Sequence, residues 1–240
     1  MKIHADIEQG SMEWDYLRAG KVTASEMDAL VTPLGKVRTG DGPYTYLMKK
    51  VAERWLQGPI PNPKKDAVWD LEQGHILEEY ARPAFTIETG IVTQRVGFVT
   101  DDKEVVGCSP DGLIGNYSGL ELKCPHIAKH IEYLLAGEVP SDYVAQVQTS
   151  MFVTGYDHWY FASFRRGFPM LILKVERDEK YQAAILQAVE SFFKSLKESW
   201  DVLLTINGGP PPPRKRFVPS SPDDPRKELF TGTHDDDVPH

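Results

Sequence analysis

Apolar residues recur three and four positions apart in several long stretches of the chain, which is the spacing of one face of an α-helix. The clearest stretch is 44–56, where the Gly-Pro-Ile-Pro sequence that follows is typical of a helix end. A hydroxyl of Thr23 or Ser25 can cap a shorter helix that runs to about Val31. The same spacing predicts four more helices, at about 66–88, which Pro83 should kink or split, and at 126–136, 141–154 and 178–204.

Short runs rich in β-branched residues lie between these helices and indicate strands. Three such runs, with Asp-Asp-Lys and Gly-Asn-Tyr-Ser turns between them, predict an antiparallel meander at 91–100, 104–115 and 118–124. Two more strands are expected at 158–164 and 170–176. This order of elements predicts an α/β fold in which helices flank one central mixed sheet.

Length and composition fit one domain followed by a tail. A chain of 240 residues with 41% hydrophobic content can bury one substantial core, which we assign to 1–206. From 207 to 240, prolines and charges leave too little apolar surface to offset ordering entropy, so a disordered tail is expected. No membrane span or signal peptide is recognisable, so we expect a cytoplasmic protein in which Cys108 and Cys124 are buried free thiols.

The formal net charge of −8 argues against a surface that binds nucleic acid through general basicity. Any contact with DNA must therefore be local. Basic residues do gather in the first third of the chain, where they could equally well contact DNA or form an ordinary solvated surface. They are Lys36, Arg38, Lys49, Lys50, Arg54, Lys64 and Lys65.

The segment SPDGLIGNYSGLELK at 109–123 holds the candidate chemistry. If Asp111 ends one strand and Gly119 begins the next, a short hairpin brings the carboxylates of Asp111 and Glu121 together. Side chains alternate along a strand, so Glu121 and Lys123 should share one face, with the leucine before each of them pointing into the core.

Two carboxylates and a backbone carbonyl are the hard ligands that Mg²⁺ and Mn²⁺ prefer, and Asp111, Glu121 and the carbonyl of Leu122 would supply them. Such an ion would neutralise a phosphate and lower the pKa of a bound water. Lys123 would hold that water and counter developing negative charge. The ordinary alternative is that Asp111 begins a turn and that Glu121 and Lys123 form an exposed pair on a strand.

Pro110-Asp111 and Glu121-Leu122-Lys123 match the PD-(D/E)xK nuclease signature. A wider resemblance covers roughly residues 10–182, in the runs LRAGKVTASE, CSPDGL, GLELKCP, YVAQVQTSMFVT, WYFASF and VERDEKY, which occur in this order. In these runs the chain resembles the lambda exonuclease family of viral recombination nucleases, within the PD-(D/E)xK superfamily. The resemblance implies a restriction-endonuclease-like core and makes residues 1–206 a nuclease domain.

The resemblance also implies further site residues. A glutamate on the helix before the sheet completes the family's metal site, and Glu78 in GHILEEYAR matches it, with Glu79 adjacent. The family's tyrosine and glutamine on the following helix match Tyr143 and Gln146 in YVAQVQ, and the glutamine would orient the attacking water. The family binds a 5′-phosphate in a pocket whose residues match Arg18, Ser25 and Ser109.

The activity implied by the resemblance is a two-metal, Mg²⁺-dependent 5′-to-3′ exodeoxyribonuclease, with Mn²⁺ as a substitute. It would act on double-stranded DNA ends and degrade the 5′-phosphorylated strand processively, leaving a 3′ single strand for single-strand-annealing recombination. A homotrimeric ring, a single-strand annealing protein as partner, and a phage or prophage origin are implied with it. Residues that would wedge or grip the duplex are not carried over, because 32–43 and 57–66 match the family poorly.

Three other functions stay open. A PD-(D/E)xK endonuclease would use the same core, and linear against covalently closed DNA separates the two activities. A non-catalytic DNA-end-binding protein is disfavoured by the intact Asp111, Glu121 and Lys123. A zinc hydrolase would use His126 and His130, but no glutamate stands at the HExxH position, so both are expected to be surface histidines.

Overall fold

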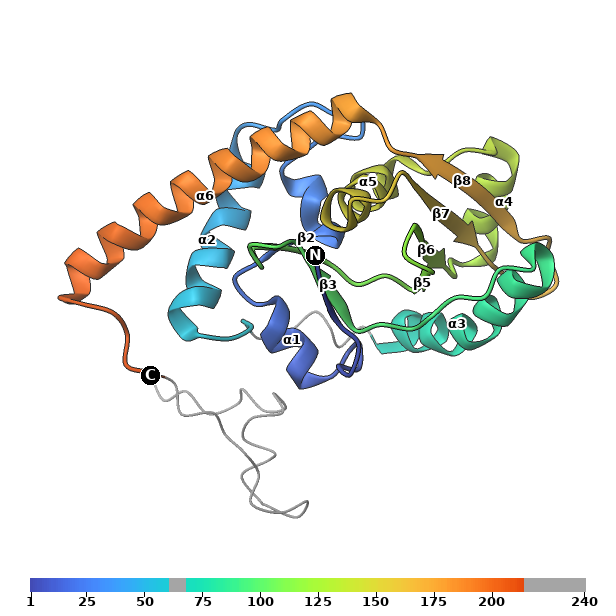
Figure 1. The fold of residues 1–240 in the computed structure, drawn as a ribbon, viewed down its shortest axis with the longest axis horizontal. Coiled ribbons are helices and arrows are strands. Elements are labelled where there is room, and N and C mark those ends of the chain that lie inside the picture. The colour runs from blue at the N-terminus through green and yellow to red at the C-terminus, as the bar shows by residue number, and fades with distance from the viewer. Residues whose placement is uncertain (61–67, 214–240) are drawn as a thin grey trace, which may run out of the picture.

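The computed structural model describes residues 1–60 and 68–213, without the side chains of 68–76 (Figure 1). Helices and strands are interleaved along the chain, which confirms the predicted α/β class. In chain order the elements are β1 (Lys2–His4), α1 (Met12–Arg18), β2 (Val22–Thr23), the 3₁₀ helix η1 (Ala24–Ala29), α2 (Asp41–Leu56), α3 (Val68–Thr89), β3 (Phe98–Thr100), β4 (Val106–Cys108), β5 (Gly112–Ile114), β6 (Ser118–Lys123), α4 (Ile127–Ala136), α5 (Ser141–Thr154), β7 (His158–Ser163), β8 (Leu171–Glu176) and α6 (Glu179–Asn207).

The strands of the described part form two four-stranded mixed sheets, where the sequence suggested one. In the first, with the order β1-β3-β4-β2, the parallel pair is β2 and β4. In the second, with the order β5-β6-β7-β8, it is β6 and β7, and α4 and α5 supply the crossover that a parallel pair needs. Helix α5 lies between the sheets, in contact with β3 and β4 of one and β7 of the other (Figure 1).

The predicted meander is wrong in one respect. The pairs β3–β4 and β5–β6 are antiparallel as expected, but β4 and β5 lie in different sheets. The chain crosses between the sheets at 109–111, where a proline lacks the N–H that a ladder needs, so Asp111 precedes a strand and does not end one. Of the run 91–100, only Phe98–Thr100 joins a sheet, and Gln94 makes an isolated bridge to β5.

The long helices agree with their predictions to within a few residues at each end. Helix α2 begins at Asp41, and α6 continues to Asn207. Helix α3 is continuous through Pro83, so the proline does not split it. Neither β1 nor α1 was predicted, since three and seven residues are too few to establish a periodicity. Most of the predicted tail, from 214 onward, lies outside the described residues.

The predicted hydroxyl cap at the start of η1 is wrong. Thr23 occupies the N-cap position, but its side chain makes no capping hydrogen bond and its Oγ1 donates instead to Glu26 Oε2 at 2.9 Å. Ser25 lies inside the helix, where its Oγ accepts from Arg18 Nη2 at 3.0 Å. Both hydroxyls are therefore engaged by charged side chains rather than by the backbone.

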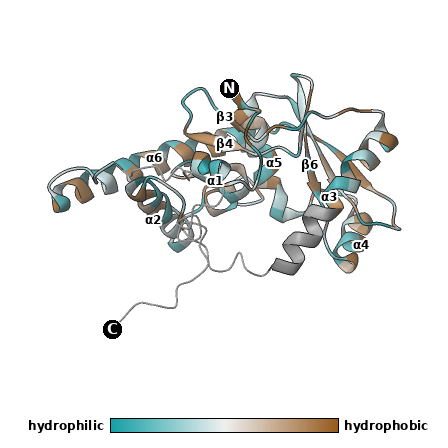
Figure 2. Cartoon of the chain, turned by 90° about the horizontal axis from the view of Figure 1, so that it is seen from below, coloured by the Kyte–Doolittle hydropathy of each residue, from teal (hydrophilic) through white to brown (hydrophobic). Residues whose placement is uncertain are grey.

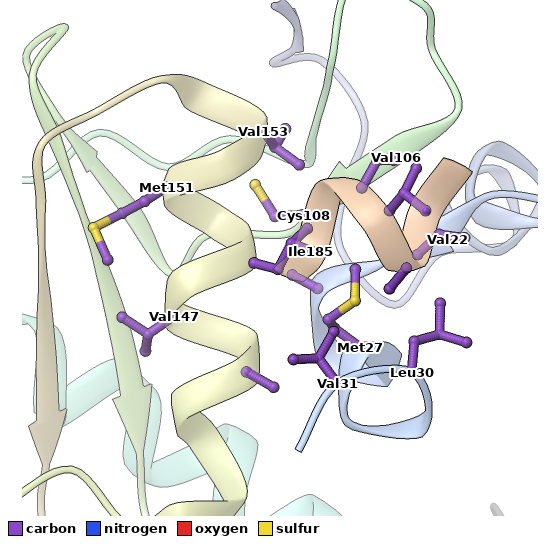
Figure 3. Close-up of a cluster of buried hydrophobic side chains, with 14 of the residues drawn as sticks. Val22, Met27, Leu30, Val31, Val106, Cys108, Val147, Met151, Val153 and Ile185 are labelled. Carbon is purple, nitrogen blue, oxygen red and sulfur yellow. The ribbon is translucent and has the colours of Figure 1, made fainter. Parts of the chain in front are cut away.

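The larger core lies where η1, α5 and α6 meet the first sheet. Figure 3 shows Met27 of η1 and Ile185 of α6 on one side of α5, whereas Met151 points from α5 to the other side, and all three are fully buried. Cys108 enters the same core from β4 as a free buried thiol, as predicted, while the free Cys124 is only half-buried. This core fixes α5, and with it any side chain that α5 presents to the sheets.

A second core packs α3 against the second sheet and comprises Ala81, Phe85, Ile114, Leu120, Leu122 and Ala162. Leu120 and Leu122 are fully buried, which confirms the predicted alternation along β6. Gly119 allows the Trp159 ring to lie directly against β6, since a Cβ at position 119 would come within 2.3 Å of the ring. These contacts set the strand that carries Glu121 and Lys123.

The outer helices are amphipathic. Figure 2 shows hydrophilic and hydrophobic residues interleaved along α2, α4 and α6, as expected for helices that bury one side. Within the described ranges, no helix combines the length and apolar character needed to cross a lipid bilayer.

Helix α2 holds a buried ion cluster against η1. Lys50 is 2% exposed, and its Nζ lies 3.0 Å from both Glu26 Oε2 and Glu53 Oε2. Lys49 pairs with the other oxygen of Glu26. Glu53 Oε2 also accepts the Gly20 N–H at 2.7 Å, so the cluster joins α2 to the segment between α1 and η1.

This cluster changes the interpretation of the basic residues in the first third of the chain. Lys49 and Lys50 form ion pairs with glutamates, and Arg54 donates to the Gly20 carbonyl at 3.2 Å. These three residues therefore support the fold rather than form a DNA-binding patch. Lys36 and Arg38 are exposed, whereas Lys64 and Lys65 lie outside the described residues.

Glu26 should make the stability of the fold pH-dependent. Burial raises the pKa of Glu26, but Lys50 and Lys49 outweigh it and lower the pKa to about 2 from its usual 4.5. Because the folded pKa lies below the unfolded one, the stabilisation is complete above pH 4.5 and is lost as the pH falls toward 2. Glu26→Gln should lower the free energy of unfolding at pH 7 by about 3 kcal/mol and flatten the acid limb of the Tm profile.

The control is Glu138→Gln, which removes a carboxylate from an exposed position. Thermal unfolding followed by circular dichroism across the acid range gives both profiles. Parallel curves for the wild type and Glu26→Gln would show that the cluster does not stabilise the fold through this charge.

Candidate active site

Asp111 stands where the chain enters β5, and the β5–β6 hairpin holds it against β6. Its N–H donates to the Leu120 carbonyl at 3.0 Å, and its Oδ2 accepts the Leu122 N–H at 2.6 Å. The side chain therefore reaches along β6 to the strand position next to Glu121. The structure brings together the two carboxylates that the sequence pairs, although Asp111 does so from the start of a strand.

Glu121 lies at the centre of a cluster of polar side chains from β6 and α5. It is 3% exposed, and its Oε1 accepts from Lys123 Nζ and from Gln146 Nε2, each at 2.6 Å. Lys123 shares its face of β6, as strand periodicity predicts. Gln146 comes from α5, which the crossover lays beside β6 and β7.

Tyr143 lies under the ammonium group of Lys123. The Nζ of Lys123 is 4.8 Å from the centre of the Tyr143 ring, a cation–π contact. The ring stacks on Phe161 at 5.5 Å between centroids and meets Tyr133 edge-on at 6.3 Å. Because two aromatic neighbours fix this ring, Tyr143 can position Lys123 beside Glu121.

A pocket of about 170 Å³ collects nearly all of the residues singled out in the sequence. Glu78 lines it from α3, whereas the adjacent Glu79 is exposed and does not, so the structure selects Glu78. Tyr143 lies outside the lining, behind Lys123. The lining consists of Gln9, Trp14, Arg18, Thr23, Ala24, Ser25, Glu78, Ser109, Asp111, Glu121, Leu122, Lys123 and Gln146.

The carboxylates make the pocket electrostatically unbalanced. Loss of surrounding water and repulsion from Glu121 raise the pKa of Asp111, and Glu78 adds to the increase. Burial acts to lower the pKa of Lys123, but Glu121 and Asp111 outweigh it and raise the pKa. Three carboxylates thus share the pocket with two cationic side chains, Lys123 and Arg18, and a bound divalent cation would offset this excess of acidic groups.

The donor set suits a hard cation, which carboxylate and carbonyl oxygens prefer. Asp111, Glu121 and Glu78 offer carboxylates, and Leu122 contributes backbone to the pocket lining. In the described ranges, no three His, Cys, Asp or Glu side chains already stand at metal-binding spacing. Glu121 Oε1 is instead held by Lys123 and Gln146, so a cation would have to share this oxygen or displace them.

Another part of the lining groups the residues predicted to bind a phosphate. The guanidinium of Arg18 stacks on the Trp14 ring, 3.8 Å from its centre, and donates to Ser25. The Trp14 Nε1 donates to Ser109 Oγ at 2.9 Å. Arg18 Nε is buried and meets no acceptor in the described part of the chain. A cationic fork with two hydroxyls nearby is suited to an anion such as phosphate.

Gln9, Trp14, Thr23 and Ala24 line the pocket but were not predicted as site residues, and the first two make contacts that shape it. Trp14 lies four residues before Arg18 on α1, a spacing that would have paired them if the helix had been predicted. Gln9 donates through Nε2 to the carbonyls of Val96 and Pro110, at 2.9 and 2.8 Å, and so fixes the backbone just before Asp111. No sequence pattern marks Gln9, because its role depends on a loop contact distant in the chain.

The histidine pair does not form a metal site. His130 is fully buried, contrary to the expectation of a surface residue, with Nδ1 2.8 Å from Ser163 Oγ and Nε2 3.0 Å from the Pro169 carbonyl. Both ring nitrogens are thus engaged, because the buried side of α4 packs against the second sheet. His126 is exposed, and its ring accepts the Lys129 N–H as the helix cap.

A family model described as the YqaJ-like viral recombinase domain matches residues 13–157. The chain belongs to this family. The match extends from α1 to the end of α5, so it includes most of the pocket: Arg18, Glu78, Asp111, Glu121 and Gln146 all lie within it.

Relatives of this YqaJ-like domain include nucleases. A protein of Escherichia coli (strain K12) described as the putative uncharacterized protein ExoD is 39% identical over 66 residues, which cover 25% of this chain and 74% of that protein. The alkaline exonuclease LHK-Exo of Laribacter hongkongensis is 28% identical with a TM-score of 0.72, covering 82% of this chain and 98% of the enzyme, and it has also been solved with dAMP. A phage-related exonuclease of Haemophilus somnus 129PT, at 15% identity and a TM-score of 0.56 over 76% of this chain and 96% of that one, shares the fold. The restriction-endonuclease-like core is confirmed.

Proposed function

We propose that this YqaJ-like domain is a metal-dependent exonuclease that degrades double-stranded DNA from its ends in the 5′-to-3′ direction. One observation carries the proposal: a group of carboxylates with a lysine, and an arginine with two nearby serine hydroxyls, line the same pocket. The first comprises Asp111, Glu121 and Lys123, and the second is built around Arg18. The likeness to LHK-Exo, an alkaline exonuclease solved also with dAMP, supports this proposal.

Asp111, Glu121, the carbonyl of Leu122 and Glu78 would hold Mg²⁺, with Mn²⁺ as a substitute. Two such ions would bind, and they would polarise the phosphate and lower the pKa of a bound water. The excess of three carboxylates over the two cationic side chains in the pocket, Lys123 and Arg18, supports this assignment. For an ion to bind Glu121, Lys123 and Gln146 would have to share its Oε1 with the ion or move away from it.

The remaining residues would act on the phosphate and the water directly. Lys123 places its charge beside Glu121, where it would counter negative charge on the reacting phosphate, and Tyr143 would keep it there. The amide of Gln146 reaches the same Glu121 oxygen, so it would orient the attacking water from α5. Phosphodiester hydrolysis needs on the order of 20 kcal/mol of barrier reduction, which several such contributions must share.

Arg18, Ser25 and Ser109 would bind the terminal 5′-phosphate. Trp14 holds this group together, because it stacks on Arg18 and donates to Ser109. A terminal phosphate fixed at one end of the pocket would leave the adjacent phosphodiester at the carboxylates. This arrangement favours cleavage at ends over internal cleavage.

The protein would also assemble with copies of itself and act together with a partner protein. A homotrimeric ring around the duplex would make degradation processive without a basic surface, which is consistent with the net charge of −8. The 3′ single strand left behind would serve a single-strand annealing protein in recombination, in a phage or prophage setting. The molar mass in solution, measured by light scattering, tests the ring: we expect three times the chain's 27.1 kDa.

Polarity of degradation is the direct test of the proposed activity. A linear duplex carrying label on one 5′ end or one 3′ end is incubated with Mg²⁺ or with EDTA. We expect early release of 5′ label as mononucleotide, late release of 3′ label, and no release in EDTA. Early release of 3′ label would reverse the polarity, and binding without release would leave only a DNA-end-binding protein.

Arg18→Gln should remove the preference for phosphorylated ends. The loss of charge-assisted hydrogen bonds should slow digestion of 5′-phosphorylated duplex by about 10- to 100-fold, with little effect on duplex that lacks the phosphate. Initial rates on both substrates give the ratio. Arg38→Gln, at an exposed position outside the pocket, is the control. Equal slowing on both substrates would assign Arg18 to another role.

A further inference from the structure

Arg82 is a partly buried arginine that the pocket does not use. It lies on α3 one turn after Glu78, on the same side of the helix, but does not line the pocket. Its Nε and Nη1 are both buried and meet no hydrogen-bond acceptor in the part of the chain that the structure describes. Because burying polar groups of a cation without acceptors is costly, these atoms call for an anionic or polar ligand.

Arg82 packs closely against the start of β5, the strand that follows Asp111. A Cβ added to Gly112 would lie 3.2 Å from Arg82 Nη1 and 2.6 Å from Thr93 Cβ. Arg82 and Thr93 therefore pack together over the backbone of the residue that follows Asp111. Thr93 Oγ1 is a third buried polar atom without a partner among the described residues.

A second arginine, Arg95, lies near enough to Arg82 for their charges to repel each other. Thr93 and Arg95 flank Gln94, which bridges β5, so in extended backbone their side chains leave on the same side. Arg95 is exposed. The pKa of Arg82 is lowered mainly by the burial of Arg82 itself and next by the charge of Arg95. The carboxylates that oppose this effect, Asp111 and Glu78, line the catalytic pocket. Arg82 thus stands between the carboxylates of that pocket and a second cation, Arg95.

We propose that Arg82, Thr93 and Arg95 form a second anion site, which binds a backbone phosphate of the DNA beside the scissile one. This inference rests on the proposed nuclease function. An arginine fork binds phosphate oxygens in pairs, the threonine hydroxyl supplies another donor, and the anion relieves the repulsion between the guanidinium groups. With Arg18 at the end of the strand, the chain would then hold DNA phosphates at two places in addition to the reacting one.

The alternative role of Arg82 is that of a counterion to Glu78 and Asp111, with no DNA contact. Salt dependence separates the two roles, because each phosphate contact contributes close to one to the slope of log Kd against log salt concentration. Binding of a linear duplex is measured by fluorescence anisotropy in EDTA at several NaCl concentrations. The proteins are the full-length wild type, Arg82→Gln, Arg95→Gln and, as a charge-matched control on the exposed side of α6, Lys194→Gln.

We expect both arginine variants to bind about tenfold more weakly and to lower the slope by about one, while the control changes neither. An unchanged slope and affinity in Arg95→Gln would overturn the site, even if Arg82→Gln fails to fold. Loss of cleavage in Arg82→Gln with an unchanged slope would also overturn it and leave the counterion role. Cleavage by the wild type is scored separately, so the second site can fail while the nuclease function stands.

Discussion

Asp111→Asn should abolish DNA cleavage and at the same time make the metal-free protein more stable. The substitution removes the charge that Glu121 and Glu78 repel, so it relieves repulsion, while an asparagine oxygen can still accept the Leu122 N–H. We expect cleavage to fall by at least about 10⁴-fold, because several electrostatic contributions fail together. Melting without metal should rise by a few degrees, and the upward shift that Mg²⁺ gives the wild type should disappear.

Asp101→Asn is the matched control for this substitution. Asp101 also accepts backbone N–H groups, those of Val105 and Val106, but it lies at the β3–β4 turn outside the pocket. It should keep wild-type activity and the melting shift with Mg²⁺. If Asp111→Asn lowers stability, or keeps the Mg²⁺ shift, then Asp111 is a structural turn residue and the metal lies elsewhere.

Lys123→Met should reduce cleavage by about 10²- to 10³-fold while the protein stays folded and still binds DNA. Methionine preserves the length and the contact with Tyr143, but it removes the charge beside Glu121 that would oppose negative charge on the phosphate. Single-turnover rates at saturating enzyme isolate this step from binding. The loss should appear in the rate and not in the affinity for the duplex.

The second sheet offers a close match as a control. Lys174 and Glu176 repeat the lysine and glutamate two positions apart on β8, and their ion pair of 2.8 Å is exposed. Lys174→Met should leave the cleavage rate unchanged, because surface ion pairs contribute little. Equal effects of the two substitutions would mean that Lys123 acts only through the general charge of this sheet.

Local periodicity accounts for most of the fold. The alternation along β6 placed Leu120 and Leu122 in the core, and helical spacing located α2, α4, α5 and α6. The division into two sheets was not predictable in this way, because it depends on where the chain crosses at 109–111, and the strands on either side have the same local pattern. Strands of two or three residues, such as β1 and β2, form only because partners from distant segments pair with them.

Some residues of the candidate site were predictable from local patterns, others only from the family resemblance, and some were missed. The pairing of Asp111 with Glu121 and Lys123 follows from a hairpin and strand alternation, both of which are local. Glu78 and Arg18 reach the pocket from separate helices, and only the family resemblance pointed to them, because no periodicity links residues on different elements. Gln9, Trp14 and the buried Lys50 were missed or misassigned since their partners lie far away in the chain.

Degradation of linear against covalently closed circular duplex tests the central claim most directly, since both substrates offer the same phosphodiesters and only one has ends. Equal masses of the same plasmid, closed or linearised with 5′-phosphorylated ends, are incubated with Mg²⁺ and with EDTA. We expect the linear form to disappear in Mg²⁺ alone and the circle to stay intact. Nicking or linearisation of the circle would contradict end-dependent action and indicate an endonuclease.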